Sequence, residues 1–177
     1  MAEKSKSGLF GFIRKNFVLF KFYFLLVYFL LLIFFIMHWN VTQKYFEDNL
    51  TKAIAQTVGV FYKVFGVEVT IKGSNVRLQS FGYNIIYDCA GVFSMTIYLS
   101  AILAFPATWK EKLQGIAIGI PFLFLLNAFR MFVLGLIGMR FNFQVFDVSH
   151  EYLWQGIFIA FVIVMWIVWK SKVVKSA

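Results

Sequence analysis

Four long apolar stretches alternate with polar segments along this chain of 177 residues. They cover residues 17–39, 89–105, 113–139 and 151–169. A helix needs about 20 apolar residues to cross a hydrocarbon core of about 30 Å, so each stretch is predicted to span a membrane. The third stretch contains Pro121 and Asn127 and must tilt or kink, because it is longer than a bilayer requires. The alternative is that it splits near Asn127 into two re-entrant pieces.

The polar segment between the first two stretches, residues 40–88, changes its pattern halfway. Its first half repeats apolar residues at helical spacing, namely Phe46, Leu50, Ile54, Val58, Phe61 and Phe65. This predicts an amphipathic helix that lies either on the bilayer or over the helical bundle. From Val67 the pattern alternates, and a turn at Gly73-Ser74-Asn75 predicts a β-hairpin with a further strand at 83–87. The predicted fold is an all-α integral membrane protein: about four transmembrane helices, this outer helix and a small β-hairpin, forming one membrane domain over 1–177.

Composition agrees with the pattern. Apolar residues make up 61% of the chain, aromatic residues 21% and charged residues only 14%, with a mean hydropathy of +0.78. Soluble domains carry about 25% charged residues, so a soluble enzyme and a disordered chain are both excluded. The basic start of the chain resembles a signal peptide, but the apolar run that follows is too long and no cleavage site follows it. The first stretch is therefore interpreted as an uncleaved membrane helix.

The net charge of +9 has two possible meanings, nucleic-acid binding or membrane orientation. With both termini in the cytoplasm, the inner segments carry nine Lys and Arg residues against two acids, whereas the outer segments carry six of each. Such an excess in short inner loops is typical of membrane proteins. The charge therefore predicts the orientation in a cytoplasmic (inner) membrane, with lipid and no nucleic acid as a partner.

In this orientation three chemically reactive residues lie at the outer ends of different spans. Cys89 begins the second span, Arg130 lies in the outer half of the third, and His150 precedes the fourth. Cys89 is the only cysteine, which excludes internal disulfides, CxxC redox pairs and cysteine-based zinc clusters. The two histidines show no zinc-ligand spacing, so neither a metal nor a cofactor is predicted. His38 has Trp39 as a neighbour, which indicates an ordinary interface anchor.

The surroundings of Cys89 favour a reactive thiol. Asp88 is a plausible helix N-cap, which would place Cys89 in the first turn, where the helix dipole favours thiolate, although the charge of Asp88 opposes this. Gly91 leaves room for a substrate backbone. The alternative is that Cys89 is a small packing residue, as lone cysteines in membrane helices often are.

Arg130 is costly within hydrocarbon, by at least about 2.5 kcal/mol, which indicates a functional residue. Its alternative is snorkelling toward the outer surface. Asn127 lies three residues earlier on the same helical face and could orient the guanidinium. For His150 the alternative is an interfacial residue at a helix start.

Together these residues suggest covalent chemistry, with Cys89 as nucleophile, His150 as acid and base, and Arg130 stabilising the thiolate or the oxyanion. Two other functions stay open. A membrane transport subunit would use Arg130 and Asn127 to line a pathway, and a lipid acyltransferase would carry its acyl group on Cys89.

Three segments resemble the exosortase/archaeosortase family of membrane cysteine transpeptidases: Asp88-Cys89-Ala90-Gly91-Val92, Asn127-Ala128-Phe129-Arg130, and His150 after the third span. The stretches 102–107, 112–115 and 150–155 are most similar to the exosortase H subgroup. The resemblance assigns Cys89 as nucleophile, Arg130 as its electrostatic partner and His150 as acid/base.

The resemblance also implies the substrate. Family substrates are exported proteins with a C-terminal sorting signal, which consists of a short motif, a transmembrane helix and a basic cluster. For the H subgroup the motif is of the IPTL type. The enzyme would cut near the motif and transfer the new carboxyl terminus on the outer side. Many members have about eight spans, so a homo-oligomer or a partner protein is expected to replace the missing helices.

Overall fold

The structure is a computed structural model, and it describes residues 17–37, 39–141 and 154–174. Helix α2 covers Phe17–Met37 and α3 covers Asn40–Val64. The strands β1, β2 and β3 follow at Val69–Lys72, Asn75–Leu78 and Gly82–Asn84. A short 3-10 helix, η1 (Tyr87–Ala90), then leads into α4 (Val92–Ala104), α5 (Trp109–Arg140) and α7 (Trp154–Lys172).

Within the described residues, two helices are long and apolar enough to cross a membrane: α2, over Leu19–Met37, and α5, over Trp109–Arg140. The predicted span at 89–105 is shortened to the 13 residues of α4. Its start is delayed because Gly91 has a φ of 73°, which separates η1 from α4. At the other end the chain turns extended at Phe105, directly before Pro106, as the sequence predicts. Four membrane-spanning helices therefore remain a prediction.

Helix α5 runs without a break for 32 residues through Pro121 and Asn127, so the alternative of two re-entrant pieces is wrong. Its start is defined by a capping box: the Glu111 backbone N–H donates to the side chain of Thr108, and the Glu111 carboxylate accepts from the Thr108 N–H. This cap begins the helix at Trp109, four residues before the predicted start.

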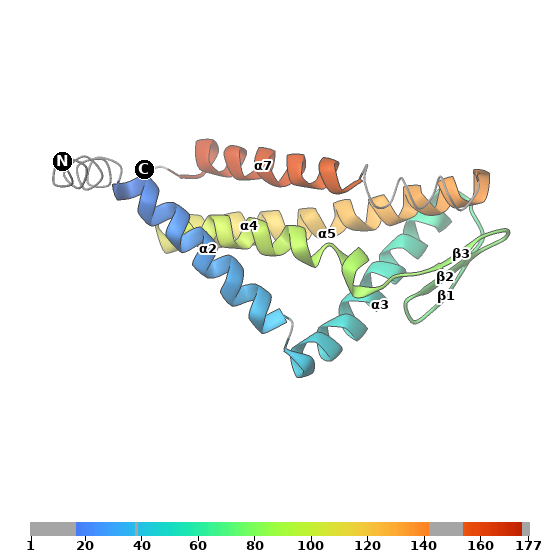
Figure 1. The fold of residues 1–177 in the computed structure, drawn as a ribbon. Coiled ribbons are helices and arrows are strands. Elements are labelled where there is room, and N and C mark those ends of the chain that lie inside the picture. The colour runs from blue at the N-terminus through green and yellow to red at the C-terminus, as the bar shows by residue number, and fades with distance from the viewer. Residues whose placement is uncertain (1–16, 38, 142–153, 175–177) are drawn as a thin grey trace, which may run out of the picture.

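One end of the molecule holds the start of α2, the start of α5 and the end of α7 (Figure 1). The ring of Phe22 lies 5.9 Å from that of Trp166. The indole N–H of Trp169 donates to the Glu111 carbonyl at 2.9 Å, and the Tyr98 hydroxyl donates to the Gly115 carbonyl at 3.1 Å. The predicted topology requires these three helix ends to lie together, because it places each of them on the cytoplasmic side of the membrane.

Helix α3 packs over the bundle, which decides between the two predicted positions for it. Ile54, Val58 and Tyr62 are completely buried in the core cluster that includes Ala128, Met131 and other residues of α5. Phe65, which the sequence pattern places on the same apolar face, is 67% exposed instead. The pattern fails there because Phe65 is the C-cap, where the chain leaves the helix with φ −88° and ψ 9°.

The small sheet forms as predicted, with the antiparallel order β1-β2-β3. The third strand ends at Asn84 rather than at 87, because Tyr87 begins η1. Two tyrosine hydroxyls, one on α3 and one on β3, form hydrogen bonds to the backbone of α5. The Tyr62 hydroxyl donates to the Phe132 carbonyl and the Tyr83 hydroxyl to the Met131 carbonyl, both at 2.9 Å, and the two hydroxyls lie 3.3 Å apart.

Candidate functional site

Cys89 lies in η1, at the point where the extended chain from β3 meets α4. Its side chain is only 6% exposed, and its backbone N–H donates to the Ile86 carbonyl at 3.0 Å. The sequence predicted Cys89 in the first turn of the long helix, and this is wrong, because Gly91 ends η1 before α4 begins. The position of Cys89 therefore does not support the predicted stabilisation of its thiolate by the dipole of the long helix.

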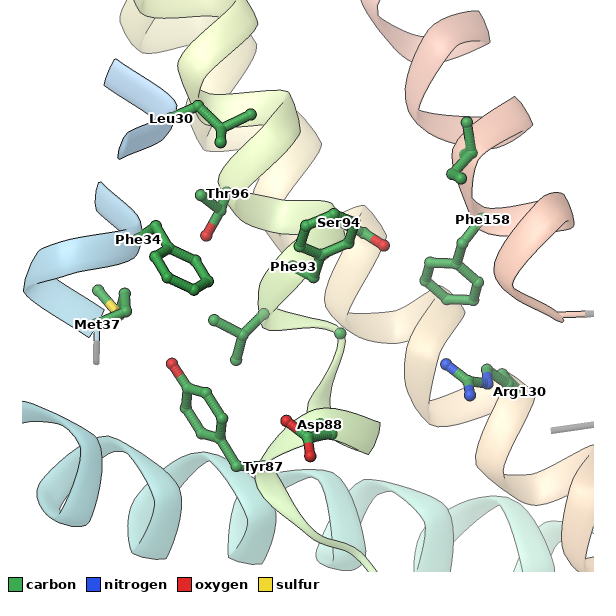
Figure 2. A pocket seen from close by; sticks show the side chains of 13 residues that line it. Leu30, Phe34, Met37, Tyr87, Asp88, Phe93, Ser94, Thr96, Arg130 and Phe158 are labelled. Atoms are coloured by element: carbon green, nitrogen blue, oxygen red, sulfur yellow. The ribbon is translucent and has the colours of Figure 1, made fainter. Parts of the chain in front are cut away.

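Asp88 is not a helix N-cap. The residue at the N-cap of α4 is Gly91, and no side chain caps either η1 or α4. Asp88 instead is exposed, and its carboxylate points toward the cavity shown in Figure 2. The consequence for α4 is an uncapped first turn, whose residues Val92, Phe93 and Ser94 line the same cavity.

Asn127 fastens the cysteine segment to α5. It is completely buried, and its side-chain N–H donates to the carbonyl oxygen of Cys89 at 3.0 Å. A Cβ atom on Gly91 would lie 3.0 Å from the side-chain carbon of Asn127, so the small residue also makes room for this amide. Asn127 was predicted to orient Arg130. The structure gives it a contact with the backbone of Cys89, which the sequence did not predict.

Arg130 faces inward rather than snorkelling to the outer surface. Its side chain is 8% exposed, and the guanidinium carbon lies 5.6 Å from the centre of the Phe158 ring on α7, within the range of a cation–π contact. Figure 2 shows the guanidinium below Phe158, directed toward the cavity. The structure thus brings Arg130 to a cavity that Asp88, the residue before Cys89, also lines.

Electrostatics at Cys89 work in opposite directions. Burial, the largest cause, raises the pKa of the Cys89 thiol above its ordinary value. The positive charge of Arg130 and the backbone hydrogen bond with Ile86 lower this pKa, and the charge of Asp88 raises it. Because the net direction is upward, burial disfavours the thiolate, and a base is needed to generate this nucleophilic form.

A cavity of about 380 Å³ lies beside these residues. Four helices and η1 contribute to its wall: Leu30, Phe34 and Met37 come from α2, Tyr87, Asp88 and Gly91 from η1 and its end, Phe93, Ser94 and Thr96 from α4, Arg130 from α5, and Phe158 and Ile159 from α7. Figure 2 shows α2 on one side of it and α5 with α7 on the other. The cavity is thus mainly apolar, with a carboxylate and a guanidinium at one end.

His150 and His38 lie outside the described residues, so their predicted roles stay predictions. Several lining residues were missed at the sequence level. Ser94 and Thr96 had a usable signal, since they are two of the three serine and threonine residues in a mainly apolar helix. Phe34 and Phe158 had none, because the chain contains 24 phenylalanines.

The fold and site define a class: a helical membrane protein with one cavity, lined by a buried guanidinium and by the 3-10 turn that holds a buried thiol. The model of the transmembrane exosortase family (Exosortase_EpsH) matches residues 9–169. The chain therefore belongs to the transmembrane exosortase family, and the resemblance noted in the sequence is confirmed. No curated protein and no solved structure matches the chain. Membership implies a membrane transpeptidase that acts on proteins with a sorting signal.

Proposed function

We propose that this protein cleaves exported proteins at a C-terminal sorting signal, on the outer face of the cytoplasmic membrane, and transfers the new carboxyl terminus to an acceptor. Cys89 is the nucleophile, Arg130 its electrostatic partner and His150 the acid/base. The observation that carries the proposal is that Asn127, three residues before Arg130 on α5, donates to the Cys89 carbonyl at 3.0 Å. Arg130 also lines the same cavity as Asp88, the residue before Cys89. The family match supports the same chemistry.

The reaction begins when His150 takes the proton of the Cys89 thiol. The sulfur attacks the scissile carbonyl carbon, forming a C–S bond and placing a negative charge on the carbonyl oxygen. When this oxyanion collapses, the C–N bond breaks, and the leaving amine receives the proton from His150. An acceptor hydroxyl, amine or water then attacks the thioester, releases the product and returns the proton to sulfur.

Arg130 supplies the positive charge that this sequence needs. In a buried site, a charged donor aimed at the developing oxyanion stabilises the transition state more than it would in water. The first turn of α4 has no side-chain cap and its residues line the same cavity, so we expect the positive end of this helix dipole to support the same charge. The role of Asn127 is to position Cys89 through the carbonyl that it binds.

His150 is assigned from the sequence and from its neighbours along the chain. Trp154, four residues later, packs against the core cluster that contains Cys89. Phe158, one helical turn further on, contacts Arg130. The start of α7 therefore lies beside the proposed site, which supports a role there for His150, four residues before Trp154 in the sequence.

The substrate helix docks laterally against the bundle and presents its motif to Cys89. The apolar residues Leu30 and Phe34 on one wall of the cavity and Phe158 on the other suit the apolar segment next to the motif. The outward orientation of the site follows from the charge distribution between the loops.

The test follows processing of a tagged exported protein that carries a sorting signal, with Cys89→Ala and Cys89→Ser as variants. Cys89→Ala should abolish processing, because no other thiol exists in the chain. The matched control is Ser100→Ala, which changes a buried hydroxyl on α4 that bonds only within its own helix, to the Thr96 carbonyl. Normal processing by Cys89→Ala would refute the proposal.

The mass of the adduct trapped on Cys89 tests the substrate class. The proposal requires a peptide mass attached through a thioester. A fatty acyl mass would contradict it and support a lipid acyltransferase instead. Silent Cys89→Ser together with a defective Arg130→Ala would support a transport subunit.

A further inference from the structure

Strand β3 forms an edge of the sheet, and half of its backbone faces away from β2. The Leu78 N–H donates to the Phe81 carbonyl at 2.8 Å, and the Ile85 N–H donates to the Ser74 carbonyl at 3.0 Å. Backbone groups alternate in direction along a strand, so those of Gly82 and Asn84 point to the open edge. Both residues are exposed, and among the described residues no turn or loop bond uses their backbone.

This edge leads straight to the candidate nucleophile. Only Ile85 and Ile86 separate β3 from η1, and Ile86 is itself extended, with φ −94° and ψ 167°. The backbone is therefore extended from Gly82 to Ile86, and Cys89 follows within one 3-10 turn. At about 3.3 Å per residue, about five residues of a peptide lying along this edge would reach from Gly82 to the region of Cys89.

The same strand is held in position relative to Arg130. The Tyr83 hydroxyl donates to the carbonyl of Met131, the residue after Arg130, at 2.9 Å. Within the ladder Tyr83 pairs with Val76, which is 1% exposed. A peptide paired with β3 is thereby aligned with both members of the proposed site by a buried anchor.

The exposed face of the sheet is hollowed and polar. A depression of about 590 Å³ is lined by side chains that include Lys72, Asn75, Arg77 and Asn84, and by the backbone of Gly82. The three strands carry two cations and no carboxylate. This face suits the side chains of a hydrated peptide strand rather than a lipid tail, which would require an apolar surface.

We propose that the extended segment of the substrate beside its cleavage site binds as a fourth strand along the open edge of β3. This inference rests on the proposed function for the identity of the occupant. Backbone hydrogen bonds to Gly82 and Asn84 hold the segment, as in other cases where a peptide extends a sheet. The scissile bond is thereby directed along 82–86 toward Cys89.

The first test compares Gly82→Pro with Gly82→Ala. Both add a side chain at an exposed position, where a Cβ atom would meet only ordinary contacts, such as the Val76 carbonyl at 3.6 Å. The φ of Gly82 is not positive, so alanine fits the backbone, and proline is tolerated in an edge strand at a position whose N–H faces outward. Only proline removes the outward N–H and blocks the edge. Processing of the tagged substrate should fall about tenfold in Gly82→Pro and stay near normal in Gly82→Ala.

The rate at which a small alkylating reagent modifies Cys89 separates folding from binding. It should be the same in both variants, because the edge does not contact the thiol. If Gly82→Pro processes substrate as fast as Gly82→Ala, the strand proposal is wrong, while the proposed function stands as long as Cys89→Ala remains inactive.

The second test does not depend on catalysis. In a Cys89→Ala background, Asn84→Cys is combined with single cysteines placed along the substrate on the outer side of its transmembrane helix. A paired strand alternates its side chains between two faces, so disulfides should form at every second substrate position. Crosslinking at consecutive substrate positions, or no crosslinking at all, would overturn the proposal. This conclusion would hold even if the Asn84→Cys variant that retains Cys89 is fully active.

Discussion

The two sides of the cavity are built differently. On one side, α5 lines the cavity through Arg130, and this helix is held by α3 and the sheet, through buried residues such as Ile54 and the hydroxyls of Tyr62 and Tyr83. On the other side, α2 packs through Phe22 near its start, whereas Phe35 and most of its large apolar residues are exposed. Figure 1 shows α2 diverging from α5 toward its junction with α3.

This difference suggests a division of labour. Catalytic groups must be held within fractions of an ångström, which requires packed and hydrogen-bonded supports. Cys89, Asn127 and Arg130 all belong to the firmly packed side. Helix α2 packs on α4 but leaves most of its large apolar side chains exposed, which is the property needed where a substrate helix has to enter from the lipid.

The largest effect should come from adding a side chain where α5 packs tightly against α3 and the sheet. A methyl group at Gly135 would overlap with the Tyr62 hydroxyl and lie 2.8 Å from the Tyr83 ring. Gly135→Ala should therefore cost about 2–3 kcal/mol and lower Tm by about 4–12 °C in detergent. Gly156→Ala on α7 is the control, because among the described residues no atom lies within 4 Å of its Cβ, and it should not lower Tm.

Adding Tyr62→Phe makes this comparison sharper. The change removes the hydroxyl that the new methyl group meets, so the double variant should lose less stability than the sum of the two single variants. Strictly additive losses would show that the tyrosine anchor is not the cause of the effect.

An intermediate effect is expected from the charges around Cys89. Replacing Arg130 by Gln removes a cause that lowers the pKa of the thiol, so the thiolate fraction falls and alkylation at pH 8 slows several-fold. Asp88→Asn removes a cause that raises this pKa, so alkylation speeds up, by a smaller factor because Asp88 is the weaker influence. Each variant is measured as a pH profile of alkylation.

Arg130→Lys serves as the control, since it keeps the positive charge and should slow alkylation less than Arg130→Gln. Changes of the same sign in Arg130→Gln and Asp88→Asn would show that charge does not govern the thiol.

The smallest effect should come from the cavity wall that α2 forms. Phe34→Ala removes a ring that lines the cavity, and it should weaken the apparent affinity for the substrate about threefold without lowering the maximal rate. Phe35→Ala removes a 63% exposed ring that does not line the cavity, and it should leave affinity unchanged. Initial rates over a range of substrate concentrations distinguish the two. Equal losses would argue against α2 as a substrate wall.

Local signals predicted much of this architecture. The alternating pattern from Val67 and the turn residues at Gly73 correctly predicted the first two strands, and Pro106 correctly predicted the end of α4. Helix starts were less accurate, because they were predicted from apolar periodicity, which contains neither the capping pair Thr108 and Glu111 nor the positive φ of Gly91. The candidate reactive residues were predicted by type and by family resemblance. Their supports, Phe158 and the tyrosine pair, were not, because aromatic residues occur in almost every segment.

The sequence by itself determined the class of environment and the candidate reactive groups. A chain with 14% charged residues and one cysteine must bury its apolar surface in lipid, and it offers a single thiol nucleophile. Only the tertiary structure decided which groups meet. Asn127 contacts Cys89 across a sequence separation of 38 residues, and Tyr62 contacts Phe132 across a separation of 70. Both contacts depend on how the helices pack, which no local sequence pattern encodes. For the same reason, the thiol that the sequence predicts in the first turn of a long helix lies instead in a separate 3-10 turn, where it is buried and where Asn127 of another helix binds its backbone.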